Sequence, residues 1–454
     1  MSGSAFVLGI AIASYEWMGA LTLIIVGKWL LPVFLKHRIY TMPQFLEQRY
    51  DHRVRTVMAL FWLGVYVFVN LTSILWLGAL AVSTVTGIDF EWGLIGLAVF
   101  ASAYSLYGGL KAVALTDIIQ VVLLVFGGLL IAVISLDEVS GGNGVLAGFH
   151  ALLERAPEKF DLIFTRDSPH YVHLPGISVL VGGLWIMNLS YWGFNQYIIQ
   201  RALAARDTNE AQKGIIFAAF LKLLMPVIVV LPGIAAVILA PDLSAPDKAY
   251  PTVMKLLPAG LKGLVFAALI AAIVSSLASM MNSISTIFTM DFYQHLGRRE
   301  KSERHLVRIG RVASFLALVI AVIVSQPLLG QFDQAFQYVQ EFTGFFTPGI
   351  VALFLLGIFW GRTTSNGALS AAIGSAVLSI AMKLWWPDLP FIDRVGLVFV
   401  ACIALGVLIS IAQKADKHPN SVDYSDVDTT TSRGFNYASL VVILILTALY
   451  AVWW

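Results

Sequence analysis

Residues 182–201 read GGLWIMNLSYWGFNQYIIQR, and no other stretch of the chain says more about its fold. The segment continues an apolar run of the kind that crosses a membrane. It nevertheless carries Asn, Ser, Tyr, Trp and Gln side chains where a lipid-facing helix carries Leu and Val. Because each unpaired polar group in hydrocarbon costs several kcal/mol, we expect these side chains to face a neighbouring helix or a watery cavity.

The composition of the whole chain is that of a membrane protein. Of its 454 residues, 58% are hydrophobic and only 12% are charged, whereas a soluble protein carries about 25% charged residues. The net charge of +2 gives no reason to expect a nucleic-acid partner. The single cysteine, Cys402, lies inside an apolar run, so we expect it to pack in the core rather than form a disulfide or a metal site.

The apolar segments predict about twelve membrane spans. A bilayer core about 30 Å thick requires about 20 apolar residues in a helix. By that measure the spans lie near residues 5–36, 55–87, 92–109, 112–136, 175–200, 211–240, 260–291, 305–326, 332–360, 364–385, 392–414 and 435–454.

The charges of the loops predict the orientation. Lys and Arg gather at residues 36–55 and again at 298–311, two loops that lie on the same side of the membrane when the spans alternate. Loops rich in Lys and Arg stay in the cytoplasm. The N-terminus and the mixed-charge loop 137–174 are therefore expected on the extracytoplasmic side.

One predicted span carries helix-breaking residues at its centre. Residues 332–360 contain Gly344 and the sequence Thr-Pro-Gly at 347–349. Proline removes a helical hydrogen bond and clashes with the preceding turn, so we expect a kink or an unwound point. Transporters built from inverted repeats bind their solutes beside such broken helices; an ordinary helix kinked by proline is the alternative.

Charged residues that fall within the predicted spans include Glu16, Asp117 and Lys222. Charges at membrane depth are rare and usually functional. The alternative for each is a residue near the interface whose charged end extends to water, and that alternative is weakest for Lys222, which lies well inside its span.

The segment 266–283 is rich in Ala and Ser and allows two interpretations. Small residues let helices approach closely, so the pattern fits packing alone. Alternatively, the Ser275 and Ser276 hydroxyls and the Ala272 carbonyl offer hard oxygen ligands that would hold a monovalent cation weakly.

Several motifs closely resemble the sodium/solute symporter family, and its bacterial sodium/galactose (sodium/glucose-type) cotransporters in particular. The likeness spans essentially the whole chain. Besides residues 182–201 it rests on ASYEWM at 13–18, YGGLKAV at 107–113 with TDIIQ at 116–120, AAIVSSLASM at 271–280, and AFQYVQE at 335–341.

The resemblance implies an all-α polytopic membrane protein with a five-plus-five inverted repeat and broken helices. Residues 1–136 would form the four remaining helices of the first repeat and 137–174 an extracytoplasmic loop. Residues 175–360 would form the second repeat and 361–454 the C-terminal peripheral helices.

The resemblance also implies roles for individual residues. The expected ligands of the sugar hydroxyls are Glu16, Asn188, Lys222 and Gln340. Tyr191 would stack on the sugar as the inner gate, while Tyr15 and Phe336 would close the pocket from outside. One half of a sodium site would come from Ala272, Ser275 and Ser276, and Asp117 would line the exit path of the ion.

The chain departs from the family pattern at two positions and at its start. Gly19 stands where the sugar-binding relatives have serine, and Ser190 replaces an aromatic residue. Family members have two further helices before the point that matches Met1, and the second completes the sodium site. The chain therefore looks N-terminally truncated, and we expect a longer protein; the alternative is a short protein that cannot couple sodium.

The implied function is sodium-coupled uptake of a hexose, galactose or glucose, across the bacterial inner membrane, with Na⁺ as coupling ion and no organic cofactor. The alternatives are a symporter of another polyol or small solute, and a truncated sugar-binding sensor that does not transport. A membrane enzyme would need a relay of titratable groups, but the eight histidines cluster in the predicted loops and at their edges. The oligomeric state stays open.

Overall fold

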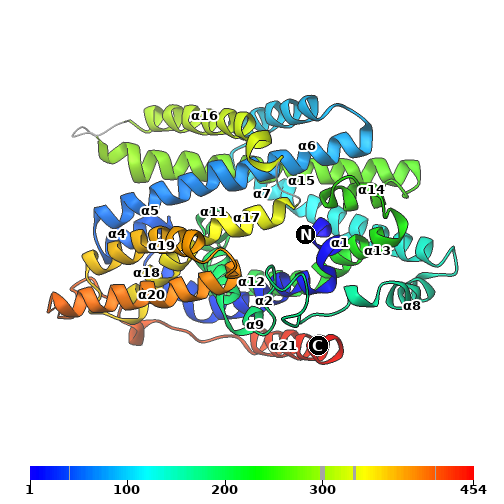
Figure 1. The fold of residues 1–454 in the computed structure, drawn as a ribbon. Coiled ribbons are helices and arrows are strands. Elements are labelled where there is room, and N and C mark those ends of the chain that lie inside the picture. Colours follow the sequence, from blue (N-terminus) through cyan, green and yellow to red (C-terminus); the bar gives the residue numbers. More distant parts are fainter. Residues whose placement is uncertain (40, 297–301, 331–333, 415) are drawn as a thin grey trace. The chain divides into compact units, whose positions relative to one another are not determined.

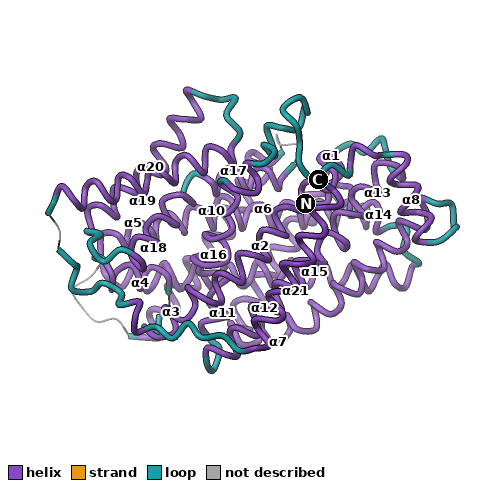
Figure 2. The backbone as a smooth tube through the Cα atoms, turned by 90° about the horizontal axis from the view of Figure 1, so that it is seen from below, coloured by secondary structure: helices purple, strands orange, loops and turns teal. Residues whose placement is uncertain are grey.

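A computed structural model describes residues 1–39, 41–296, 302–330, 334–414 and 416–454. Every regular element among these residues is a helix, as Figure 1 and Figure 2 show. The prediction of an all-α membrane protein is confirmed.

Nine helices of the described residues are long and apolar enough to cross a membrane, and one bent pair of helices adds a tenth. Two predicted spans, 92–109 and 112–136, lie on one continuous helix, α7 (Phe90–Val139). The predicted span 175–200 is divided into short pieces: α9 (Ser178–Val181), α10 (Gly183–Leu189), a π-helical segment (Ser190–Phe194) and α11 (Gln196–Leu203). Each of the twelve predicted segments is therefore largely helical.

The chain divides into two compact units, each assembled from three stretches of sequence. Unit 1 comprises residues 1–13, 63–162 and 224–340, and unit 2 comprises residues 14–62, 163–223 and 341–454. The predicted division into inverted repeats follows different boundaries and stays a prediction.

Unit 1 is built around the long helices α7 and α15 (Ala259–Thr286), which pack against each other. Its buried core includes Ile131, Met254 and Val265, together with Ala236 and Ala249. The other helices of this unit are α1 (Ser2–Leu8), α6 (Thr72–Thr86), α8 (Val145–Arg155), α13 (Leu231–Leu239), α14 (Ala249–Met254), α16 (Glu303–Leu329) and most of α17 (Ala335–Gly344).

Unit 2 has an aromatic core. The rings of Phe194 and Phe354 stack with centroids 4.4 Å apart, and Phe45 stacks on the Phe354 ring at 5.5 Å. Phe34 meets the Phe45 ring edge-on at 5.4 Å. Besides α9, α10 and α11, this unit contains α2 (Ser14–Ile25), α3 (Leu31–Lys36), α4 (Met42–Arg49), most of α5 (His52–Gly64) and of α12 (Thr208–Met225), α18 (Thr347–Phe359), α19 (Ser365–Trp385), α20 (Phe391–Ala412) and α21 (Arg433–Trp453).

The predicted break near Gly344 is confirmed. Helix α17 ends at Gly344, α18 begins at Thr347, and the two are bent by 47°. Pro348 lies in the first turn of α18, where its missing N–H costs no helical hydrogen bond. Proline and glycine therefore start a new helix here rather than kink a continuous one.

Arg49 joins α4 to the C-terminal end of α18. Its side chain is almost completely buried, and it donates to the carbonyl oxygens of Gly357 (2.9 Å), Trp360 (3.2 Å) and Thr363 (3.3 Å). The last carbonyls of a helix have no partner within the helix, so the guanidinium supplies the missing donors. The absence of a side chain at Gly357 lets Arg49 approach, since a Cβ atom there would lie 3.3 Å from the Arg49 Cγ.

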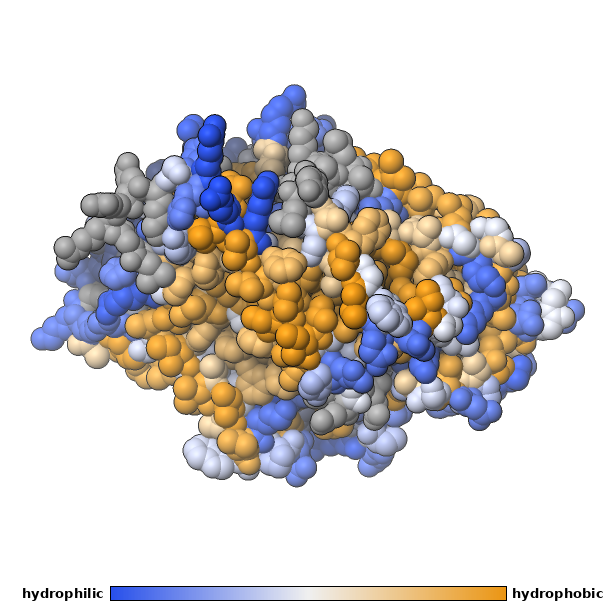
Figure 3. Space-filling model, turned by 90° about the horizontal axis from the view of Figure 1, so that it is seen from above, coloured by the Kyte–Doolittle hydropathy of each residue, from blue (hydrophilic) through white to orange (hydrophobic). Residues whose placement is uncertain are grey.

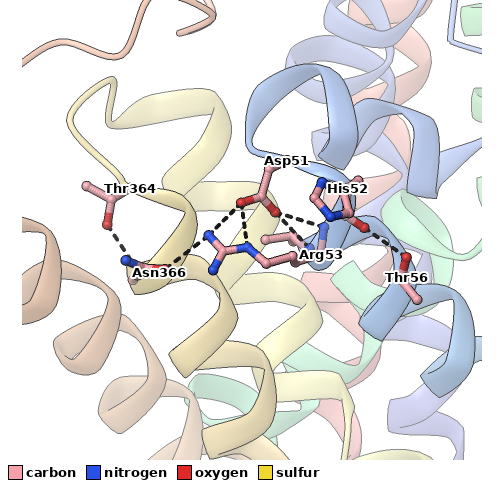
Figure 4. A network of polar contacts seen from close by, with 8 residues as sticks. Asp51, His52, Arg53, Thr56, Thr364 and Asn366 are labelled. Atoms are coloured by element: carbon pink, nitrogen blue, oxygen red, sulfur yellow. Dashed lines mark hydrogen bonds and ion pairs between the residues drawn. The ribbon is translucent and has the colours of Figure 1, made fainter.

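A second arginine, Arg53, links the starts of α5 and α19 at the surface. Figure 4 shows its guanidinium between Asp51 and Asn366, with hydrogen bonds of 2.8 Å and 3.1 Å. Burial alone would raise the pKa of the Asp51 carboxyl, but the hydrogen bonds from Arg53 and from the Val54 N–H, together with the Arg53 charge, outweigh this effect and lower that pKa.

Large hydrophobic side chains lie at the surface of many helices. Figure 3 shows a wide area of such side chains on one face of the molecule. Exposed examples on α20 and α21 are Leu397, Val400, Leu440 and Leu444. Outward-facing apolar side chains on long helices are what a bilayer requires.

Candidate functional site

An ion pair inside unit 2 marks the first candidate site. The Lys222 ammonium on α12 donates to Oε2 of Glu16 on α2. Only 12% of the Glu16 side chain and 19% of the Lys222 side chain are exposed. Burying two charges this far from solvent has a high free-energy cost unless they are paired. The ion pair therefore accounts for the presence of both charged residues in predicted membrane spans. The sequence predicted both residues but not their ion pair.

Asn188 and Trp192 lie beside this ion pair. The Lys222 ammonium is 4.5 Å from the centroid of the Trp192 ring, a cation–π contact. Asn188 is buried on α10, and its Nδ2 donates to the Leu184 carbonyl at 3.1 Å. A Cβ atom placed on Gly19 would lie 3.0 Å from the Trp192 Nε1 and 3.1 Å from the Asn188 Oδ1. Four helical segments therefore bring acidic, basic, amide and indole groups together.

This group of Glu16, Asn188, Trp192 and Lys222, which we call the polar cluster, is chemically suited to a polyhydroxylated solute. A hydroxyl group both donates and accepts hydrogen bonds, and the cluster offers a carboxylate acceptor, an ammonium donor and an amide that does both. The indole ring adds an apolar face. The sequence did not single out Trp192 as a site residue, although its position in the polar segment 182–201 was the signal that could have found it.

The residues predicted to act as gates lie on three different helices. Tyr191 is exposed and meets the Trp192 ring edge-on at 5.0 Å. Tyr15 is buried on α2, next to Ser14, which accepts a 2.9 Å hydrogen bond from the Tyr450 hydroxyl. Phe336 and the predicted sugar ligand Gln340 lie one turn apart on α17 and so share a helix face. Their roles as gates and ligand stay predictions.

The second candidate site lies in unit 1. The hydroxyl of Ser275 on α15 donates to Oδ1 of Asp117 on α7. Ser275 is buried, and Ala272 and Ser276 lie within one turn of it on the same helix. Hydroxyl, carbonyl and carboxylate oxygens are the ligands that hard cations prefer. The sequence predicted Asp117 on the exit path of the ion, and the structure places it in direct contact with the predicted ion ligand Ser275.

Gly19→Ala is expected to destabilise the folded protein by about 1–3 kcal/mol, because the new methyl group would crowd Trp192 and Asn188 by a few tenths of an ångström. Thermal unfolding in detergent measures this. The matched control is Gly214→Ala on α12, where nothing lies within 4 Å of the added Cβ. Both changes replace a helical glycine by the better helix former, so equal effects at the two positions would contradict crowding of the cluster.

Comparison with known proteins identifies relatives along nearly the whole chain. Residues 1–374 match the family described as the sodium:solute symporter family. The chain is 46% identical to the sodium/glucose cotransporter of Vibrio parahaemolyticus over 472 residues, covering 100% of this chain and 87% of that protein. It is 32% identical to the sodium/myo-inositol cotransporter 2 of Mus musculus, covering 84% of this chain and 60% of that protein.

A solved structure shows the same fold. A Na⁺-coupled sialic acid symporter in a substrate-bound, outward-open state has a TM-score of 0.78 and 22% sequence identity, with 90% of this chain and 85% of that chain covered.

Proposed function

The chain belongs to the sodium:solute symporter family and is a sodium-coupled transporter of a small solute, and from this premise we propose that its solute is a hexose, galactose or glucose. The observation that carries the proposal is the polar cluster, in which the Glu16–Lys222 ion pair lies against Trp192. The identity with a sodium/glucose cotransporter supports it.

In the proposed binding mode, the ionic and amide groups bind sugar hydroxyls. Glu16 accepts hydrogen bonds, Lys222 donates them, and Asn188 does both. Trp192 covers the apolar face of the pyranose. Tyr191 stacks on the sugar when the inner gate is closed. Gln340 adds a further amide, and Tyr15 and Phe336 close the pocket from outside. The sugar replaces hydrogen bonds that water would otherwise make with these buried groups.

The sodium ion is proposed to bind at Ala272, Ser275 and Ser276, beside Asp117. Coupling requires that each ligand increase the affinity for the other by the same factor. A sodium ion bound in unit 1 would therefore favour the sugar-binding state, and inward sodium flow would drive sugar uptake. We place the protein in the bacterial inner membrane with the N-terminus of this chain on the extracytoplasmic side, and we propose that its helices form two inverted repeats, 1–136 and 175–360.

A polyol such as myo-inositol is the second candidate solute. Relatives named sodium/myo-inositol cotransporters favour it, because they are 32% identical to this chain. Carboxylate, ammonium and amide groups serve the hydroxyls of an inositol as well as those of a sugar. A sensor that binds sugar without transport is a third candidate.

Sodium-gradient-driven uptake into proteoliposomes tests the proposal. The purified chain should concentrate labelled galactose or glucose when sodium is high outside, and replacing sodium by choline should abolish this. Uptake of myo-inositol with neither hexose would identify the second candidate. Binding of a hexose without uptake or counterflow would identify the sensor, and the symporter proposal would then be wrong.

Ser276→Ala is expected to raise the sodium concentration for half-maximal uptake by about tenfold, since one oxygen ligand worth about 1.4 kcal/mol is lost. The sodium dependence of uptake at saturating sugar measures this. Ser283→Ala is the control, because Ser283 lies about two turns further along α15 and its hydroxyl donates to the Ser279 carbonyl. An unaltered sodium dependence in Ser276→Ala would remove this residue from the ion site.

A further inference from the structure

A second cluster of charges lies in unit 2, apart from the polar cluster. The Glu341 Oε1 accepts hydrogen bonds from the Lys383 ammonium at 2.5 Å and from the Arg394 Nη2 at 3.2 Å. The three side chains come from α17, α19 and α20. We call this group the charge clamp.

The charge clamp differs from an ordinary surface ion pair. Only 6% of the Arg394 side chain is exposed, so its charge depends on Glu341 for compensation. Aromatic rings line the same place: the Arg394 Cζ lies 5.3 Å from the Phe345 centroid, and the Lys383 ammonium lies 5.6 Å from the Phe342 centroid. Charges shielded by apolar rings attract each other more strongly than charges in water.

The charge clamp holds the last turn of α17, just before the break. Helix α17 ends at Gly344 and α18 starts at Thr347 at a 47° bend. Because no regular helix connects them, the rotation of α17 about its own axis is not dictated by α18, and side-chain contacts must set it. Helix α19 supplies a second contact at this point, where the Ser375 hydroxyl donates to the Phe345 carbonyl at 2.9 Å.

Gln340 lies between two such anchoring contacts. Two residues before it, the Tyr338 hydroxyl donates to the Phe68 carbonyl at 2.9 Å. One residue after it, Glu341 is held by the charge clamp. Since successive residues of a helix are related by a fixed rotation, holding Glu341 also sets the direction in which the Gln340 side chain leaves the helix.

We propose that Glu341 is a positioning residue for solute binding: clamped by Lys383 and Arg394, it fixes the rotation of α17 and thereby aims the Gln340 amide at the sugar. The inference rests on the proposed function, in which Gln340 is a ligand. Glu341 itself does not contact the sugar in this scheme. It acts through the helix turn that carries both residues.

Glu341→Gln tests the positioning role, because glutamine keeps the size of the side chain and removes its charge. The half-saturating sugar concentration should rise roughly threefold to thirtyfold, the range for residues that act on a ligand without touching it, while the rate at saturating sugar stays near that of the unmodified protein. Glu341→Asp, which keeps a carboxylate beside Lys383 and Arg394, should stay closer to the affinity of the unmodified protein than Glu341→Gln.

Glu210→Gln is the matched control, since Glu210 forms an exposed ion pair with Lys213 at 2.8 Å on α12. Thermal unfolding in detergent, followed by tryptophan fluorescence, separates folding defects from binding defects. An unchanged half-saturating concentration in Glu341→Gln would overturn the proposal. A loss of uptake in proportion to the loss of folded protein would also overturn the proposal. If the unmodified chain takes up no hexose, the proposed function fails, and the positioning role fails with it.

Discussion

Lys222→Ala is expected to reduce sodium-driven sugar uptake by at least about a hundredfold. The substitution removes a donor to the sugar and also leaves Glu16 buried without its partner, although only 12% of the Glu16 side chain reaches solvent. Breaking a buried ion pair in this way costs about 3–5 kcal/mol of folding stability. The lost charged donor to the sugar is worth about 1.5–3 kcal/mol of binding, which is roughly a tenfold to hundredfold change in affinity. Initial rates of labelled hexose uptake in proteoliposomes measure the effect.

Lys213→Ala is the control for this change, because it removes the same side chain from the same helix. Lys213 pairs with Glu210 at the surface and has 59% of its side chain exposed, so its loss should cost at most about 1 kcal/mol. The double change Glu16→Gln with Lys222→Met should restore stability without restoring uptake, because both charges are gone together. Uptake by Lys222→Ala within a few-fold of the unmodified protein would refute the role of the ion pair.

Arg49→Met is expected to destabilise the folded protein by about 3–5 kcal/mol. The Gly357 and Thr363 carbonyl oxygens, at and just beyond the end of α18, lose their donor, whereas the Trp360 carbonyl keeps its hydrogen bonds from Thr363. Each buried acceptor left unsatisfied costs about 1–3 kcal/mol. Burial lowers the pKa of the Arg49 guanidinium from its usual value. Methionine fills the same volume without supplying a hydrogen-bond donor. Thermal unfolding in detergent should show a clearly lower midpoint.

Arg53→Met supplies the comparison for Arg49→Met. Arg53 follows Arg49 by four residues, yet 51% of its side chain is exposed and its partners, Asp51 and Asn366, lie at the surface. Its loss should therefore change stability by about 1 kcal/mol or less. Equal loss of stability in the two variants would contradict the capping role of Arg49.

Hydropathy was sufficient to predict that the chain is an all-α membrane protein and where most of its helices lie. The break between α17 and α18 was predicted from Gly344 and Pro348, because these residue types disrupt a helix at their own position whatever surrounds them. The continuity of α7 was not predicted, because the apolar stretch was divided by length into two spans, 92–109 and 112–136.

The candidate site was predictable residue by residue but not as a set of contacts. Glu16 and Lys222 were each conspicuous as charges in an apolar run, yet they are 206 positions apart in sequence. Only the fold brings them together. The same applies to Ser275 and Asp117, whose contact joins α15 to α7. Trp192 was missed because an aromatic residue in a membrane span is commonplace, and its place in the polar segment 182–201 was not used; in the structure the Lys222 ammonium lies over its ring.

Helix α18 shows how differently such a protein is held together from a water-soluble one. Nearly all of its residues from Thr347 to Ile358 are buried, and its sequence TPGIVALFLLGIF is as compatible with lipid as with protein. Transfer of this helix from lipid to the protein interior therefore brings no favourable hydrophobic free energy. Its place in the interior depends on steric fit with its neighbours. A Cβ atom on Gly349 would lie 2.7 Å from the Ser375 Cβ of α19. Where α18 packs on α19, the complementary shape of the two helix surfaces, rather than the burial of apolar area away from water, holds the helices together.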